Sequence, residues 1–260
     1  MPERGALALR WAAPALAVLV FLLGWEAAVR HYDIPPYLLP APSLVLRTLW
    51  DNFGSLAQSW WVTVSITFAA LALAVLGGVL LAAVFALSRW VEWSLTPFAV
   101  VLQVTPVIAV APLIMILTDS ALATVLVCAW IVAFFPILAN TVTGLRSADA
   151  NLRDLFRLYR ASRWQTLRHL LIPSALPYFM TGLKIAGGLS LIGAVVAEFT
   201  AGAAGRNTGL ASRILEAAFR TEIPKMFAAL LLVSLTGVAI YLLFALLSRL
   251  VLKRWHESEA

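Results

Sequence analysis

The chain has 260 residues, of which 62% are hydrophobic and only 12% are charged, and its mean hydropathy is +0.92. Soluble domains carry about 25% charged residues, so this composition excludes an ordinary soluble domain and indicates an integral membrane protein. The formal charge of +6 fits basic residues retained on the cytoplasmic side of a membrane, and we therefore expect no nucleic-acid partner.

Six segments are long and apolar enough to cross the bilayer, because a helix needs about 20 residues to span the hydrocarbon core. In chain order they are residues 11–29, 60–87, 94–117, 121–145, 175–201 and 226–247. The first follows Arg4 and Arg10 as a signal peptide would, but no small-residue cleavage site follows it, so we expect a retained anchor. The sequence therefore predicts an all-α integral membrane protein with about six transmembrane helices.

The distribution of basic residues predicts the orientation. With the N-terminus inside, the inner segments carry twelve basic residues and the outer segments six. The inner ones are Arg4, Arg10, Arg89, Arg146, Arg153, Arg157, Arg160, Arg163, Arg168, Arg249, Lys253 and Arg254, and the outer ones are Arg30, Arg47, Arg206, Arg213, Arg220 and Lys225. Basic residues concentrate in cytoplasmic loops, so we expect both termini in the cytoplasm.

The expected organisation follows from these spans. Residues 1–30 form an N-terminal cytoplasmic tip and the first transmembrane helix, and residues 31–59 form a periplasmic segment. Residues 60–250 form the transmembrane core, which includes a cytoplasmic loop at residues 144–173. Residues 251–260 form a cytoplasmic tail.

The loop at 144–173 is basic and has the pattern of a short amphipathic helix. Leu152, Leu155, Phe156 and Tyr159 fall at i, i+3, i+4 and i+7, which places them on one face. Arg153, Arg157 and Arg160 occupy another face, and Asp149 is a candidate helix cap. Such a helix either lies on anionic lipid headgroups or inserts its apolar stripe into the groove of a partner protein.

A second helix start follows directly. Ser162 and Gln165 have the spacing of a capping box, in which each side chain satisfies a backbone amide of the other residue. Pro173 predicts a change of direction into the fifth span. We therefore expect two short helices that meet near residues 160–162.

This loop resembles the cytoplasmic coupling motif of permease subunits of ATP-binding-cassette importers, which is written Glu-Ala-Ala, three residues, then Gly. Asp154, Leu155 and Phe156 stand at the Glu-Ala-Ala positions, and Arg160 stands at the glycine position. Further similar stretches occur at residues 39–43, 88–90, 134–141, 161–164, 171–177, 181–184, 197–199 and 209–210. The resemblance covers residues 35–254 and is nearest to the branch that imports sulfonates, taurine, nitrate, bicarbonate and thiamine or riboflavin precursors.

The resemblance implies the type I importer permease fold with cytoplasmic coupling helices. It also implies partners: a second permease copy in a homodimer, ATPase subunits that bind ATP and Mg²⁺, and an extracytoplasmic substrate-binding protein. The positions that it assigns to ATPase coupling are Leu152, Asp154, Leu155, Phe156, Arg157, Tyr159, Arg160, Ala161, Ser162 and Arg163. Arginine disfavours the left-handed conformation that glycine adopts easily, so we expect Arg160 in an ordinary helical or bridging conformation.

The chain itself carries no sequence signature of catalysis. It lacks the phosphate-binding pattern G-x-x-x-x-G-K-[ST], a carboxylate pair and a nucleophile motif, and its only cysteine is Cys128. We therefore expect no catalytic residue, no metal site and no cofactor bound by this chain. An ion-coupled secondary transporter and a non-transporting membrane scaffold are the alternatives, although Glu198 lies near a span end rather than mid-membrane.

Polar residues within the spans are the candidates for a translocation pathway, because they are costly in lipid. Gln103, Thr105 and Pro106 lie together in the third span. Thr105 has the alternative of bonding to its own helix at a kink. Asn140 has the alternative of an interhelical hydrogen bond, and Glu198 that of a structural hydrogen-bonding role.

Overall fold

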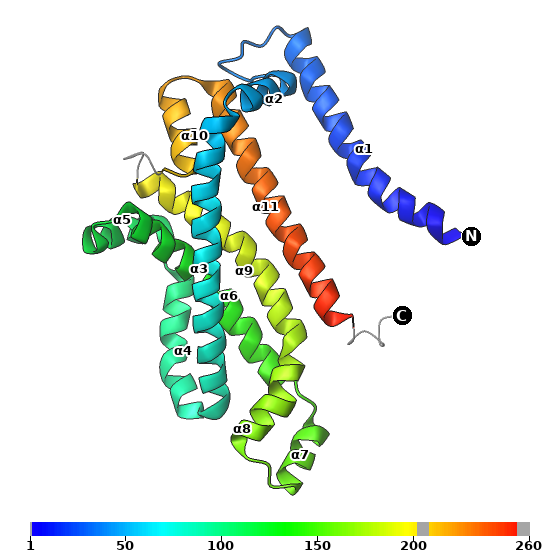
Figure 1. Cartoon of the computed structure of the whole chain (residues 1–260), viewed down its shortest axis with the longest axis vertical. Coiled ribbons are helices and arrows are strands. Elements are labelled where there is room, and N and C mark those ends of the chain that lie inside the picture. The colour runs from blue at the N-terminus through cyan, green and yellow to red at the C-terminus, as the bar shows by residue number, and fades with distance from the viewer. Residues whose placement is uncertain (1, 202–207, 254–260) are drawn as a thin grey trace.

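The computed structural model describes residues 2–201 and 208–253, and all regular elements in these ranges are helical (Figure 1). In chain order they are α1 (Pro2–His31), α2 (Pro42–Asp51), α3 (Phe53–Leu87), α4 (Arg89–Val104), α5 (Val107–Thr118), α6 (Ala121–Arg146), α7 (Ala150–Leu158), α8 (Arg163–Thr166), the π-helical turn η1 (Leu167–Leu171), α9 (Ile172–Ala201), α10 (Leu210–Phe219) and α11 (Ile223–Leu252). Within these ranges five helical segments are long and apolar enough to cross a membrane, or six if the bent pair α4–α5 forms one span. The expected all-α membrane architecture is confirmed. Residues 254–260 of the expected tail lie outside the described residues.

The span expected at residues 94–117 is not a single straight helix. α4 and α5 meet at an angle of 103°. Thr105 and Pro106 between them are extended, because the ring of Pro106 disfavours a helical backbone at the preceding residue. α5 turns away from the direction of α4 (Figure 1) and packs against α6 and α9, where Ala111 is buried.

The span expected at residues 175–201 is longer than the sequence indicated. Helical backbone runs without interruption from Arg163 through α8, η1 and α9, and residues 163–200 together form one candidate span. The expected change of direction at Pro173 was wrong. In the π-helical turn the backbone amide of Ile172 bonds to the carbonyl of Leu167, one residue further back than in an α-helix. This wider turn precedes Pro173, which has no amide hydrogen to continue the α-helical ladder.

Helices α3, α6 and α9 form the centre of the bundle. Their buried core includes Ile137, Leu138 and Leu183. α6 and α9 approach each other closely at Gly182, where an added Cβ atom would lie 2.8 Å from Cβ of Asn140 and 2.9 Å from the carbonyl oxygen of Pro136. Only glycine fits there, so α6 and α9 are held as a closely packed pair.

The short helices gather at opposite ends of the molecule. α7 and α8 lie at one end, beyond the ends of α3 and α4, whereas α2 and α10 lie at the other (Figure 1). α1 stands apart from the bundle, and its attachment is at the α2 end. There Glu26 accepts hydrogen bonds from the backbone amide of Ser43 at 3.0 Å and from its Oγ at 2.7 Å.

Candidate functional site

Helix α7 presents an exposed apolar stripe at its end of the molecule. Asp149 caps the helix and accepts hydrogen bonds from the amides of Asn151 and Leu152 at 2.7 and 3.2 Å. Leu152 and Leu155 are 46% and 44% exposed and Tyr159 is 80% exposed. Apolar surface of this kind at the tip of a protein is typical of a binding site for another protein.

The sequence pattern missed one member of this surface. Leu158 is 81% exposed and lies in the last turn of α7. It follows Leu155 by three residues, and this spacing was the available signal. Phe156, by contrast, is half-buried.

The turn after α7 holds Arg160 in the left-handed conformation, with φ of 51°. The amide of Arg160 donates to the carbonyl oxygen of Arg157 at 2.9 Å, and the amide of Ala161 donates to the carbonyl oxygen of Phe156 at 2.9 Å. These two bonds define a Schellman motif, whose C′ position is usually glycine. The expectation of an ordinary helical or bridging conformation was therefore wrong. The turn that a glycine would make is retained, at a conformational cost of about 1–2 kcal/mol.

The capping box at the start of α8 is present. The Ser162 side chain accepts from the Gln165 amide at 3.2 Å, and the Ser162 amide donates to Oε1 of Gln165 at 2.7 Å. The turn between α7 and α8 is therefore fixed on both sides by specific hydrogen bonds. Because α8 continues into α9, this turn is joined directly to a long helix of the bundle.

Two arginines bind this coupling segment, defined as residues 149–166, to the ends of the long helices. Nη2 of Arg153 donates to the carbonyl oxygens of Leu145 and Arg146 at 3.1 and 2.6 Å. Nη1 of Arg163 donates to the carbonyl oxygen of Leu87 at 3.3 Å. Cations are favourable at helix C-termini, where the last carbonyls lack partners within the helix. Arg153 therefore faces inward and does not share a solvent-exposed basic face with Arg157.

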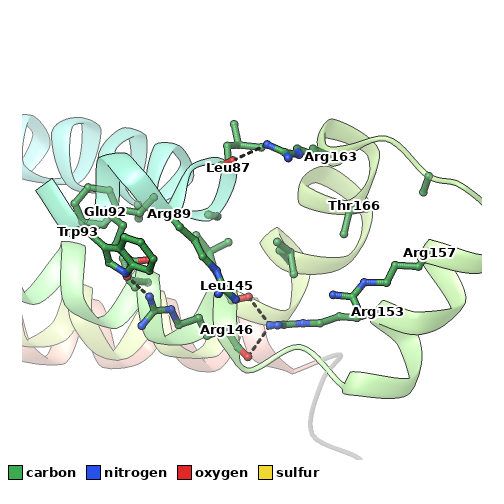
Figure 2. A pocket seen from close by; sticks show the side chains of 16 residues that line it. Leu87, Arg89, Glu92, Trp93, Leu145, Arg146, Arg153, Arg157, Arg163 and Thr166 are labelled. Carbon is green, nitrogen blue, oxygen red and sulfur yellow. Dashed lines mark hydrogen bonds and ion pairs between the residues drawn. The ribbon is translucent and has the colours of Figure 1, made fainter. Parts of the chain in front are cut away.

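A pocket of about 930 Å³ lies between the coupling segment and the ends of α3, α4 and α6 (Figure 2). Its charged lining consists of Arg89, Glu92, Arg146, Arg153, Arg157 and Arg163. Glu92 forms an ion pair with Arg146, and Arg157 pairs with Asp154 at 3.1 Å. Arg89 was expected only among the inner basic residues and in a family-like stretch, and its place in this pocket was not predicted.

The polar residues expected along a pathway do not all come together. Gln103 is exposed on the last turn of α4, and Pro106 is exposed at the bend. Thr105 donates from Oγ1 to the carbonyl of Val101 at 2.6 Å, so it bonds to its own helix. Asn140 lies elsewhere, against Gly182 in the α6–α9 contact.

Asn140 also uses its side chain differently from the expected interhelical hydrogen bond. Its Nδ2 atom donates to the carbonyl of Pro136 at 2.8 Å, within α6. A smaller, apolar pocket of about 240 Å³ adjoins the bend and is lined by Pro106, Val107, Ile108, Val132, Ile192, Gly193 and Val196. Asn140 follows Val132 by eight residues, about 12 Å along α6, which separates it from this pocket.

Glu198 is buried, with 4% of its surface exposed, and both of its oxygens accept hydrogen bonds. Thr63 on α3 donates from Oγ1 to Oε1 at 2.9 Å, and the Ala211 amide donates to Oε2 at 2.9 Å. Thr63 in turn accepts from the amide of Leu210 at 2.8 Å. A Cβ atom on Gly209 would lie 2.0 Å from Oε1, so the loop backbone packs directly on the carboxylate.

Glu198 thus caps the N-terminus of α10 and joins it to α3 and α9. A carboxylate at a helix N-terminus is favourable, because the unpaired amides there carry partial positive charge. In this conformation the carboxylate is enclosed by protein. Nothing in the sequence pairs Thr63 with Glu198, since the two residues are far apart in the chain.

A comparison with known protein families identifies the chain. The profile described as "Binding-protein-dependent transport system inner membrane component" matches residues 74–255. The chain belongs to this family. The match includes the whole coupling segment, both pockets and Glu198.

Individual relatives agree with this assignment. The riboflavin transport system permease protein RibX of Chloroflexus aurantiacus is 35% identical over 95% of this chain and 92% of its own length. The formylaminopyrimidine transport permease protein ThiX of Halalkalibacterium halodurans is 33% identical over 95% of this chain and 96% of its own. The putative aliphatic sulfonates transport permease protein SsuC of Bacillus subtilis is 26% identical over 95% and 89%.

A solved structure supports the fold. A chain of an amino acid transporter of the ATP-binding-cassette class superposes with a TM-score of 0.62, at 16% identity, and the match covers 77% of this chain and 96% of that chain. Together with the relatives, this shows a type I permease fold. The protein is the permease subunit of an ATP-binding-cassette importer, and the alternatives of a secondary transporter and a scaffold do not fit.

Proposed function

We propose that this permease carries a small polar or anionic organic solute into the cell, after an extracytoplasmic binding protein delivers it. The importer relatives are named for riboflavin, formylaminopyrimidine and sulfonates, and the first two are the more similar to this chain. A vitamin or vitamin precursor is therefore the favoured class of solute. ATP and Mg²⁺ act in partner ATPase subunits, and this chain binds no cofactor of its own.

The observation that carries the proposal is the exposed apolar stripe of α7. It lies on the coupling segment, which is bound to α3 and α6 and continues into α9. Leu152, Leu155, Leu158 and Tyr159 insert into a groove of the ATPase subunit, as an amphipathic helix binds in an apolar groove. Phe156 is the half-buried apolar member of the coupling set. The polar and small positions of the coupling set, which surround the stripe, are Asp154, Arg157, Arg160, Ala161, Ser162 and Arg163.

Movement of the ATPase reaches the spans through two connections. One is the pair of hydrogen bonds from Arg153 to the end of α6. The other is the continuous helix from Arg163 into α9. Because α6 and α9 pack closely at Gly182, both connections act on one rigid pair of helices. Rotation of this pair alternately opens the pathway to each side of the membrane.

The pathway forms where the α4–α5 bend meets a second copy of the permease in a homodimer. Gln103 is exposed in an otherwise apolar region, which is costly in lipid unless water or protein covers the side chain. Ile108, Leu113 and Ile116 on α5 are between 56% and 79% exposed and offer an apolar contact surface beside it. Thr105 and Pro106 shape the bend, whereas Asn140 and Glu198 contribute to the pathway only after a rearrangement of the helices around them.

The protein is a multi-pass protein of the inner membrane, with both termini and the coupling segment in the cytoplasm. The excess of basic residues in the coupling segment and the other inner segments supports that orientation. Then α2 and α10, at the opposite end, face the binding protein.

A pair of matched substitutions tests the proposal. Leu155→Asp places a charge in the stripe of α7, and Leu46→Asp places one on α2, whose Leu46 is 58% exposed at the opposite end. We expect Leu155→Asp to abolish co-purification of the ATPase subunits and ATP-driven uptake, while Leu46→Asp leaves assembly with the ATPase intact. Equal ATPase binding by the wild type and Leu155→Asp would contradict the proposed coupling site.

A further inference from the structure

The large pocket beside the coupling segment has an unusual charge. Five arginines and one glutamate line it, namely Arg89, Arg146, Arg153, Arg157, Arg163 and Glu92. Figure 2 shows Arg89 directed into the pocket from α4 and Arg153 and Arg157 directed into it from α7. Guanidinium groups that converge on one space repel one another unless an anion lies between them.

Part of this charge is already used within the protein. Arg146 pairs with Glu92, Arg157 pairs with Asp154, and Arg163 binds a carbonyl at the end of α3. Arg153 uses Nη2 for the carbonyls of α6, but its Nε atom is buried and has no hydrogen-bond partner among the described residues. Arg89 likewise forms no hydrogen bond or ion pair with the described part of the chain. Arg89 therefore holds donors available for a ligand, whereas Nε of Arg153 is closed to one.

The size and location of the pocket indicate the kind of anion. A volume of about 930 Å³ is far larger than a single inorganic anion requires. Trp90 and Trp93 lie in the first turns of α4 and are 77% and 62% exposed, and Trp93 also lines the pocket. Exposed tryptophans of this kind lie at the level of the lipid headgroups, so the pocket adjoins the membrane interface.

We propose that this pocket binds the phosphate-bearing headgroup of an anionic phospholipid, taken from the leaflet at the α7 end. The phosphate oxygens accept hydrogen bonds from the guanidinium group of Arg89, while the guanidinium groups of Arg153 and Arg157 in the lining add positive charge. Basic pockets between helices at the cytoplasmic interface are suited to such headgroups.

The bound headgroup connects two parts of the molecule. Arg89 belongs to the α3–α4 end, and Arg153 and Arg157 belong to the coupling segment. A phosphate held between them stabilises the position of α7 relative to the long helices. The lipid thereby favours the conformation in which movement of the coupling segment reaches the spans. This lipid site does not depend on which solute is transported.

The test uses the full-length protein, purified in detergent with equal amounts of phosphatidylglycerol and phosphatidylcholine, and native mass spectrometry of the retained lipids. We expect the wild type to retain phosphatidylglycerol preferentially. Arg89→Gln should reduce this preference roughly fivefold, the effect of one basic residue near an anionic surface. Arg168→Gln is the matched control, because Arg168 is exposed on the neighbouring turn, carries the same charge and does not line the pocket.

Two further arms separate the alternatives. Arg89→Lys should keep most of the preference, and an unchanged thermal unfolding midpoint shows that Arg89→Gln is folded. Equal retention of the two lipids by the wild type overturns the proposal, as does an equal effect of Arg89→Gln and Arg168→Gln. Displacement of phosphatidylglycerol by millimolar inorganic phosphate would assign the pocket to a free anion instead and would also overturn it.

Discussion

Arg153 donates a hydrogen bond from Nη2 to the carbonyl oxygen of Leu145 at 3.1 Å, and this contact attaches α7 to the last turn of α6. The same atom also bonds to the carbonyl of Arg146. A charged donor is thus placed at the negative end of a long helix, where it satisfies carbonyls that the helix leaves unpaired. The coupling segment is therefore attached to the bundle by side-chain contacts as well as by the chain itself.

Arg153→Gln should separate ATP hydrolysis from transport. Glutamine is too short to reach both carbonyls, so α7 would still present its stripe but would no longer be fixed to α6. We expect the ATPase subunits to assemble and hydrolyse ATP, while the amount of solute transported per ATP falls severalfold in proteoliposomes. Arg168→Gln, which removes the same charge from an exposed site, should leave that ratio unchanged.

Arg160→Gly should stabilise the protein. Arg160 has φ of 51°, and glycine adopts this conformation without the cost of about 1–2 kcal/mol that other residues bear. Arg157→Gly is the opposite case, because Arg157 lies in the last turn of α7 and glycine costs about 1 kcal/mol in a helix. Thermal unfolding and hydrogen exchange at residues 158–162 measure both effects. A lower melting temperature for Arg160→Gly would contradict the assigned turn.

Gly182→Ala and Gly188→Ala should change stability in opposite directions. At Gly182 an added Cβ atom meets Asn140 and a backbone carbonyl of α6 within 3 Å, so α6 and α9 must separate, at a cost of about 1–3 kcal/mol. At Gly188 nothing lies within 4 Å of the added atom, and alanine is the better helix former. Thermal unfolding in one detergent compares them. Similar changes at both sites would argue against close packing at Gly182.

Thr63→Val should destabilise the end of the bundle at which α10 lies. Valine keeps the shape of threonine but removes the donor to Glu198 and the acceptor for the Leu210 amide, both buried. An unsatisfied buried polar group costs about 1–3 kcal/mol. Hydrogen exchange at residues 210–219 should increase. Thr143→Val is the control, because that exposed hydroxyl bonds only to its own helix.

We expect the folding stability to depend weakly on pH through the carboxylate of Glu216 on α10. A hydrogen bond from Arg213 lowers the pKa of Glu216 below its ordinary value of 4.5, and the charges of Arg213 and Arg220 act in the same direction. Its stabilising effect is therefore present above that ordinary value and is lost as the pH falls through the lowered pKa of the folded state. In Glu216→Gln the acid-dependent decrease in melting temperature should be smaller than in the wild type. An identical decrease in the two proteins would contradict a stabilising role for the Arg213–Glu216 pair.

Local patterns accounted for the helical segments and the caps. The runs of apolar residues predicted the spans because a helix must cross a fixed thickness of lipid with all its backbone groups paired. Asp149 and the Ser162–Gln165 pair were identified correctly because a cap depends only on residues within one turn. The motif-like positions from Asp154 to Arg160 also placed the exposed stripe on the right helix, although Leu158 was missed.

Two backbone features opposed the conformational preferences of single residues and became visible only in the structure. The left-handed turn at Arg160 opposes the local preference of arginine, and the hydrogen bonds on both sides of the turn hold it there. The π-helical turn before Pro173 likewise kept a helix continuous where the local signal predicted a change of direction.

The sequence by itself determined a membrane-spanning helical protein and the two short helices of the coupling segment, because burial in lipid and helix capping act over short stretches of chain. Only the folded structure brought Thr63 to Glu198 and Arg89 to Arg153. Those juxtapositions arise from the packing of helices far apart in sequence. The pattern of apolar residues in a single helix does not determine which other helix packs against it.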